Sequence, residues 1–210
     1  MKNLFLIIAV SGLFMQLSAQ EIKVSSTCSY STYNAFSSNF GYVVGYDFFN
    51  NSKSRSGVSF TQTFNNTNYS GSYFYDAYGE TYYYKIEPEN QRLGLYFDYG
   101  YNLSNSVNHS IFIGFKLGLN FLYFDGIIHE RKYKESEYTT YNSNGRWENN
   151  KFGAGVIFEY NKKITDKISI YASVEPEAVF YRRLYASSDM NPPMIGFINF
   201  NLGIKFNTKH

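Results

Sequence analysis

The sequence predicts an all-β protein: a closed antiparallel transmembrane β-barrel with short periplasmic turns and long outer loops. Three observations predict this fold class. Residues 110–124 alternate strictly between an apolar set and a small or polar set, segments with the same alternation recur along the chain, and the connectors between them differ in length in a regular way. Eight such segments can be counted, and the alternative count is ten if the Tyr-rich stretch 65–90 forms two wall strands of its own.

The clearest strand is the segment SIFIGFKLGLNFLYF at residues 110–124. Successive side chains of a β-strand point to opposite faces. One face carries only Ile, Phe and Leu until Tyr123, whereas the other includes Gly114, Lys116, Gly118 and Asn120. A long strand with these two faces is typical of a wall between lipid and a narrow, polar interior.

The first 19 residues are expected to be a secretory signal peptide, with the barrel formed by residues 20–210. Lys2 supplies a positive start, residues 4–15 form an apolar core, and Leu17-Ser18-Ala19 offers a peptidase site. The alternative is an uncleaved membrane anchor. The apolar run is shorter than the about 20 residues that a spanning helix needs, so cleavage is favoured.

In the mature chain, alternation predicts strands at residues 22–31, 40–49, 56 to about 64, 91–103, 110–124, 151–161, 167–184 and 194–206. Residues 65–90 are expected to continue both flanking strands beyond the membrane as a hairpin that turns near 77–79. Residues 125–150 are expected to form a long charged connector. Pro176 lies within a predicted strand, and because proline has no N–H to donate, we expect a bulge or a local kink there.

The connectors after the second, fourth and sixth predicted strands are short, and two of the others are much longer. In an even-stranded antiparallel barrel, short periplasmic turns and long outer loops produce this difference. The pattern therefore predicts that both ends of the mature chain lie on the periplasmic side.

Alternation alone does not say which set faces inward, because a soluble barrel around a small ligand would enclose the apolar set. The non-apolar set is rich in Gly, Ser and Asn, as a narrow lumen requires, and aromatic residues gather at the ends of the apolar faces. We therefore place the non-apolar set inside. It carries charges of both signs that could pair across a lumen as a structural network, with a proton or ion path as the alternative: Arg92, Asp98, Lys116, Glu159, Glu175, Glu177 and Lys205.

The sequence predicts no catalytic residue, no cofactor-binding residue and no metal site. Among the 3 histidines, only His129 has a neighbouring acid and hydroxyl, Glu130 and Ser136, that an enzyme acting on surface lipid could use. The spacing of these residues matches no known triad or metal motif. A solvated, charged loop is the simpler interpretation.

Aromatic residues make up 20% of the chain, with 22 Tyr and 20 Phe. Exposed aromatic side chains favour binding, and the predicted outer loops contain a candidate recognition surface of Tyr73, Tyr75, Tyr78, Tyr82 and Trp147. The alternative is that tyrosine simply suits extended hairpins.

The signal peptide, the GFKLGLNF strand, the VEPEAVFY segment and the final NFNLGIKF strand resemble the small eight-stranded outer-membrane barrels of the OmpA/OmpX type, including PorT-like barrels. The resemblance covers the mature chain and implies an architecture and an outer-membrane location. One departure is the end of the chain, which continues with Asn-Thr-Lys-His after Phe206, where such barrels often end on an aromatic residue.

The formal net charge of +2 is too small to indicate nucleic-acid binding. Because Cys28 is the one cysteine of the sequence, an internal disulfide is excluded. The expected partners are outer-membrane lipid, the barrel-assembly machinery and an unidentified extracellular or envelope ligand, with the chain itself monomeric. The expected function is that of a non-enzymatic outer-membrane barrel that presents its outer loops for binding or adhesion, or stabilises the envelope. The alternatives are a barrel enzyme that acts on surface lipid and a narrow channel for small solutes.

Overall fold

The computed structural model describes residues 21–32, 38–50, 53–65, 68–75, 80–104, 106, 108–132, 136–180 and 194–208. These residues form ten strands: β1 (Glu21–Ser31), β2 (Ser38–Asn50), β3 (Ser54–Asn65), β4 (Tyr69–Tyr75), β5 (Glu80–Pro88), β6 (Asn90–Asn102), β7 (His109–Lys132), β8 (Thr139–Lys163), β9 (Ile168–Phe180) and β10 (Met194–Asn207). In this part of the chain, no helix is long and apolar enough to cross a membrane. The predicted signal peptide lies outside the described residues, and its cleavage stays a prediction.

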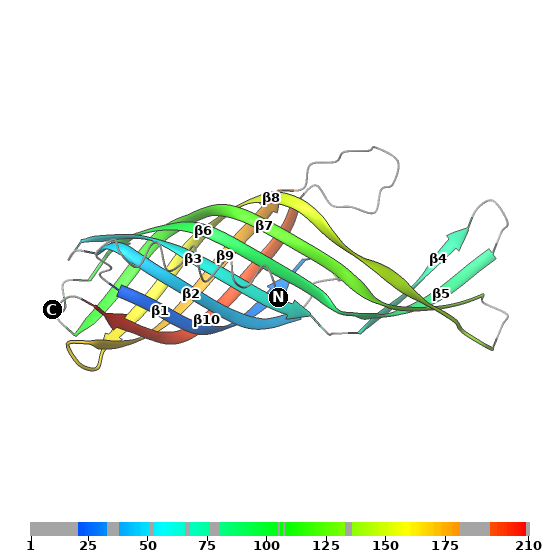
Figure 1. The fold of residues 1–210 in the computed structure, drawn as a ribbon, viewed down its shortest axis with the longest axis horizontal. Helices are drawn as coiled ribbons and strands as arrows, with labels where there is room; N and C mark the ends of the chain where they lie inside the picture. The colour runs from blue at the N-terminus through cyan, green and yellow to red at the C-terminus, as the bar shows by residue number, and fades with distance from the viewer. Residues whose placement is uncertain are drawn as a thin grey trace.

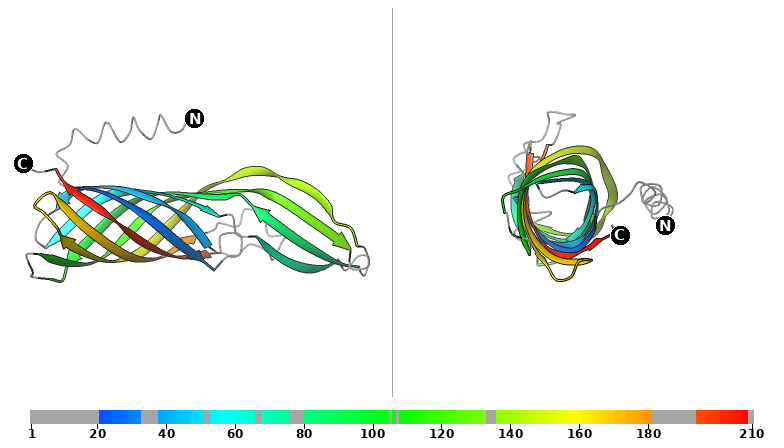
Figure 2. Two further views of the ribbon diagram at one scale, coloured as in Figure 1. Left: turned by 90° about the horizontal axis from the view of Figure 1, so that it is seen from below. Right: turned by 90° about the vertical axis from the view of Figure 1, so that its left-hand side faces the viewer.

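Eight of the ten strands close into an antiparallel barrel in the order β1–β2–β3–β6–β7–β8–β9–β10 (Figure 1, Figure 2). The barrel closes where β1 pairs with β10 along its whole length, from Glu21↔Asn207 to Ser31↔Phe197. Closure pairs the edges that an open sheet would expose. The predicted closed eight-stranded barrel is therefore confirmed.

Strands β4 and β5 continue β3 and β6 beyond the barrel and are not additional wall strands. The pair Asn65↔Asn90 of β3 and β6 is followed, four residues further along each strand, by Tyr69↔Ile86 of β4 and β5, so the register is unchanged. β5 likewise pairs with β7 in the register that β6 has. The prediction that the Tyr-rich stretch continues both flanking strands as a hairpin is confirmed, and its predicted turn at 77–79 lies outside the described residues.

The prediction of a long connector at residues 125–150 is wrong, because β7 runs on to Lys132 and β8 begins at Thr139. A strand that has left the lipid-facing wall needs no apolar–polar alternation, so its sequence lacks the usual signal. The pairing of β7 with β8 shifts register between Asn120 and Leu122 and again between Phe124 and Gly126. At the second shift Gly126 has a φ of 144°, a conformation that residues other than glycine rarely adopt.

Together β4, β5, β7 and the first half of β8 form a sheet that projects from one end of the barrel, which we call the outer sheet (Figure 1, Figure 2). We call this end of the barrel the outer end. The opposite end, which we call the turn end, holds the start of β1, the end of β10 and the described connector residues 53, 103, 104, 106, 108 and 164–167. The predicted division into one end of short turns and one end of long outer segments therefore agrees with the structure.

Of the bulge or local kink predicted at Pro176, the bulge does not form. The ladder between β9 and β10 continues through Pro176↔Ile198. On the other side of β9, the ladder with β8 passes from Gly155↔Glu177 to Phe158↔Val174 without a register shift, but the two pairs in between are missing. Because proline lacks an N–H, its effect is a local gap in one ladder rather than an extra residue.

The two faces of the wall differ sharply in polarity. Leu117 and Leu119 of β7 are 40% and 42% exposed on the outside of the barrel. Lys116, which lies between Phe115 and Leu117, points inward and is 2% exposed. Large apolar side chains are exposed all round the barrel, as shown by Val24, Val44, Leu95, Phe115, Phe158, Ile170 and Leu202. An exterior of this kind is solvated by acyl chains and not by water, so the soluble-barrel alternative does not fit.

We predict that Leu117→Lys blocks assembly of the barrel, because a charge on the lipid face near the middle of the membrane costs about 2–4 kcal/mol. Leu117→Met, which keeps volume and polarity, should assemble normally. Heat-modifiable migration of the detergent-solubilised protein on a gel reports the folded fraction. Equal folding of the two variants would contradict the outward orientation of Leu117.

Candidate functional site: the lumen and the outer sheet

Near the turn end, the lumen holds a cluster of buried ion pairs that we call the turn-end cluster. Arg55 Nη1 lies 3.1 Å from Asp47 Oδ2, and Arg55 Nη2 lies 2.7 Å from Glu159 Oε2. Lys205 Nζ reaches the other oxygen of Glu159 at 2.5 Å, and Lys23 Nζ lies 2.7 Å from Asp98 Oδ2. These side chains are at most 6% exposed. The cluster therefore neutralises its charges internally rather than through water.

Aromatic rings fill the remaining space of the turn-end cluster. The Arg55 guanidinium lies 5.2 Å from the centre of the Phe112 ring, and Lys205 Nζ lies 5.2 Å from that of Tyr171. Cations over ring faces at these distances are attracted by the ring quadrupole. Bulky rings and paired charges together leave little open cross-section in this part of the lumen.

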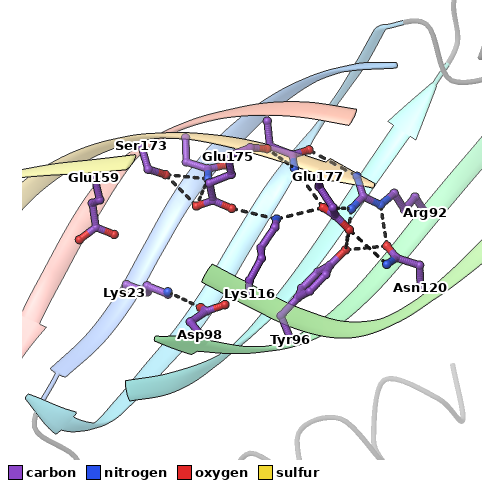
Figure 3. Close-up of polar contacts among 12 residues, drawn as sticks. Lys23, Arg92, Tyr96, Asp98, Lys116, Asn120, Glu159, Ser173, Glu175 and Glu177 are labelled. Carbon is purple, nitrogen blue, oxygen red and sulfur yellow. Dashed lines mark hydrogen bonds and ion pairs between the residues drawn. The ribbon is translucent and has the colours of Figure 1, made fainter. Parts of the chain in front are cut away.

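A second set of ion pairs lies closer to the outer end, and we call it the upper cluster (Figure 3). Glu177 is at its centre: Arg92 Nη2 lies 2.5 Å from Glu177 Oε2, and Lys116 Nζ lies 3.0 Å from the same oxygen. Lys116 Nζ also lies 3.0 Å from Glu175 Oε2. Two cations thus share two carboxylates, and the side chains of Arg92 and Glu177 are fully buried.

Hydrogen bonds from neutral groups complete the upper cluster. Tyr96 Oη accepts a hydrogen bond from Arg92 Nη2 at 2.5 Å and lies 2.6 Å from Glu177 Oε1. Asn120 Oδ1 accepts from Arg92 Nε at 2.8 Å, and Asn201 Nδ2 donates to Glu175 Oε1 at 2.7 Å. Buried charges are tolerable when pairing and hydrogen bonds satisfy them. The upper cluster meets this condition at both carboxylates.

Apolar side chains lie inside the barrel at its outer end. Leu122, Val179, Ile195 and Phe197 point inward and are at most 1% exposed. The Arg92 guanidinium lies 4.0 Å from the centre of the Phe197 ring, which joins this apolar layer to the upper cluster. The lumen is therefore filled in succession by paired charges and by apolar packing.

The structure places all of the predicted lumen charges inside the barrel, but in two groups. Arg92, Lys116, Glu175 and Glu177 meet in the upper cluster, while Asp98, Glu159 and Lys205 belong to the turn-end cluster. The sequence reasoning missed Lys23, Asp47 and Arg55. Asp47 and Lys23 follow the alternation of their strands and could have been found, whereas Arg55 precedes the predicted start of its strand at residue 56.

The outer sheet carries a second group of polar and aromatic contacts. Lys85 Nζ lies 2.7 Å from Glu87 Oε1, and this hydrogen bond lowers the pKa of Glu87. The Arg131 guanidinium lies 5.3 Å from the ring centre of Tyr83 and 5.2 Å from that of Tyr138. These residues come from β5, β7 and the segment that precedes β8, so cation–ring contacts hold neighbouring strands together.

The candidate recognition residues are spread along the outer sheet. Tyr73 pairs with Tyr82, and Tyr75 pairs with Glu80, in the hairpin of β4 and β5. Trp147 pairs with Tyr123 much closer to the barrel. Tyr78 lies outside the described residues. The structure therefore brings Tyr73 and Tyr82 side by side but does not bring Trp147 to them.

The grouping of His129, Glu130 and Ser136 does not form in the structure. His129 and Glu130 are consecutive in β7 and point to opposite faces. His129 Nδ1 instead lies 2.9 Å from Thr140 Oγ1, and His129 Nε2 lies 3.8 Å from Glu87 Oε1. Among the described residues, no group of three or more His, Cys, Asp or Glu side chains could hold a metal ion.

We predict that Glu177→Gln destabilises the folded barrel by about 3–5 kcal/mol, because it leaves Arg92 and Lys116 without their shared buried carboxylate. The matched variant Glu87→Gln removes the partner of Lys85 on the exposed outer sheet, where water screens the two charges, and should change the free energy of unfolding far less. Urea unfolding in lipid vesicles measures both changes in the free energy of unfolding. Similar costs at the two positions would contradict the role assigned to Glu177.

No protein-family model and no curated protein sequence matches the chain. Several solved structures match the chain in fold. Neisserial surface protein A superposes with a TM-score of 0.60 at 9% sequence identity, over 89% of this chain and 96% of that one. A major outer membrane protein from Thermus thermophilus superposes with a TM-score of 0.50 at 10% identity, over 89% of this chain and 98% of that one. At such low identity the similarity concerns the fold, and the chain has the fold of the small eight-stranded outer-membrane β-barrels.

Proposed function

We propose that the chain is an integral outer-membrane barrel without enzymatic activity, whose outer sheet is a surface for binding or adhesion. One observation carries the proposal: four neighbouring strand paths continue past the outer end as a sheet, while the lumen beneath them is filled. The barrel holds this sheet at the membrane surface. Its proposed partners are outer-membrane lipid, the barrel-assembly machinery that inserts it, and an envelope or extracellular ligand.

The filled lumen argues against a channel. Arg92, Lys116 and Glu177 are buried and paired with one another, and Leu122 and Phe197 pack above them. An open aqueous pore needs a continuous polar path wide enough for water, and it is the larger barrels that leave one. The paired charges support a structural role in which the barrel stabilises itself, and through its lipid belt the envelope around it.

The outer sheet has features that suit recognition. Tyr82 and Tyr83 lie near the cations of Lys132 and Arg131, and tyrosine and arginine are the residues that most often dominate binding energies at interfaces. These side chains are half-buried within the sheet and so are held in place before a ligand arrives. Preorganised side chains lose less conformational entropy on binding.

We predict that replacing residues 66–89 by Asn-Gly abolishes attachment while the barrel still assembles. Asn65 and Asn90 are directly paired, and a two-residue Asn-Gly turn joins antiparallel strands well. Attachment of expressing cells to immobilised mucin, to collagen and to bare polystyrene is counted after washing. Heat-modifiable migration confirms assembly. Unchanged attachment to every surface would contradict the proposal.

A second function, an enzyme acting on surface lipid, is favoured only by the contacts of His129 with Thr140 and Glu87. General-base activation of a hydroxyl uses such a contact, but these side chains lie on a sheet surface. We predict that His129→Ala leaves the composition of surface lipid unchanged, as measured by mass spectrometry of outer-membrane extracts. A lipid species that disappears in His129→Ala cells and persists in Lys85→Ala cells would support the enzyme instead.

A further inference from the structure

A hollow of about 560 Å³ lies in the outward wall of the barrel near the outer end, over β8, β9, β10 and the end of β1. Small side chains form its floor: Ala154, Pro176, Ala178 and Gly196. Ala154 pairs with Ala178, and Ala178 pairs with Gly196, so the floor crosses three neighbouring strands. The volume falls within the range of about 300–1,000 Å³ that is typical of ligand sites.

Aromatic side chains bound the hollow on two sides. The rings of Phe152 and Phe180 stack with their centres 6.2 Å apart, just beyond the floor toward the outer end. On the side of β1, Tyr30 packs edge-on against Phe200 with 6.1 Å between the ring centres. All four rings are exposed on the outside of the barrel. The hollow is therefore an apolar slot that opens toward the acyl chains around the barrel.

One backbone acceptor in the floor has lost its donor. The ladder of β8 and β9 lacks the pairs Val156 with Pro176 and Ile157 with Glu175. Loss of a single hydrogen bond accounts for both, because both pairs depend on a bond from the backbone nitrogen of residue 176 to the Val156 carbonyl, and proline has no N–H. A carbonyl that faces β9 does not reach β7 on the other side of its strand. Val156 and Pro176 both line the hollow.

The inward side of the floor is closed by the upper cluster. A Cβ added to Gly155 would lie 3.2 Å from Glu177 Cβ, so Glu177 packs directly against the strand that carries the Val156 carbonyl. Glu177 is fully buried and engages the cations of Arg92 and Lys116. A donor for the carbonyl is therefore to be sought on the membrane side.

We propose that the hollow binds one acyl chain of an outer-leaflet lipid, and that a hydroxyl group on this chain donates a hydrogen bond to the Val156 carbonyl. An unpaired backbone group is costly in hydrocarbon, where no water pairs it. A plain acyl chain would fill the slot and leave the carbonyl unpaired, whereas a hydroxylated chain does both. This inference rests on the outer-membrane lipid named among the proposed partners, and it specifies the chemistry of that lipid.

The test observes the Val156 carbonyl directly. Val156–Ile157 is the one Val–Ile step in the sequence, so isotope labels on the valine carbonyl carbon and the isoleucine nitrogen give a single carbonyl–nitrogen correlation by NMR. The full mature chain is placed in bilayers of phosphatidylcholines that differ only in the presence and position of one hydroxyl group on an acyl chain. Because hydrogen bonding deshields a carbonyl carbon, we expect its resonance to move to higher chemical shift in hydroxylated lipid and to saturate as the hydroxylated fraction rises.

Three variants separate binding in the hollow from a general effect of the lipid. Ala178→Leu fills the hollow and should abolish the shift, whereas Ala172→Leu, on the same strand and face but outside the hollow, should retain it. Pro176→Ala restores the N–H and should give the hydrogen-bonded chemical shift in every lipid. Heat-modifiable migration confirms that each variant is assembled.

Three results would overturn the inference: a resonance that is unchanged in every hydroxylated lipid, a shift that persists in Ala178→Leu, or a resonance that already has the Pro176→Ala position in plain phosphatidylcholine. The last result would mean that water pairs the carbonyl. The measurement involves no attachment surface, so failure of the lipid site and failure of the proposed attachment give different results.

Discussion

Closure of the ladder between β1 and β10 is the constraint on which the rest of the structure depends. In hydrocarbon, each unpaired backbone group costs several kcal/mol, so a sheet can cross a membrane only when its first and last strands meet. β1 pairs with β10 over its full length and so meets this requirement. Closure also divides every strand into an outward and an inward set, and it makes the inward set share one narrow lumen.

The narrow lumen explains why its charges pair so tightly. Arg92 and Glu177 come from β6 and β9, strands that are separated in the barrel by β7 and β8, and yet their side chains meet across the interior. Water cannot compensate a charge at such a site, so each cation needs a carboxylate within reach. Large side chains on one strand are accommodated by small ones nearby: a Cβ at Gly94 would overlap the ring of Tyr96. Charge pairing and close packing are thus two consequences of one geometry.

These consequences differ in how far they could be predicted from sequence. Alternation is local, so residues 110–124 alone indicate the wall and its two faces, and Lys116 could be placed inside by its position between Phe115 and Leu117. The pairing of particular charges is not local, because it depends on the stagger of strands around the barrel, which no single strand reveals. For this reason the expected single network proved to be two clusters. The outer halves of β7 and β8 were missed for a different reason: they lie beyond the lipid-facing wall, and their sequences do not alternate between apolar and polar residues.

Beyond the outer end the constraint no longer applies, and the same strands behave differently. In the barrel β3 has partners on both sides, whereas its continuation β4 pairs with β5 alone among the described strands. Water can satisfy the backbone groups of such an edge, so leaving it open costs little there. Strand paths that closure holds between two neighbours in the barrel are thus freed from that requirement once they leave it. The barrel anchors the outer sheet and sets the direction of its strands, because β4 and β5 continue β3 and β6 in the same register.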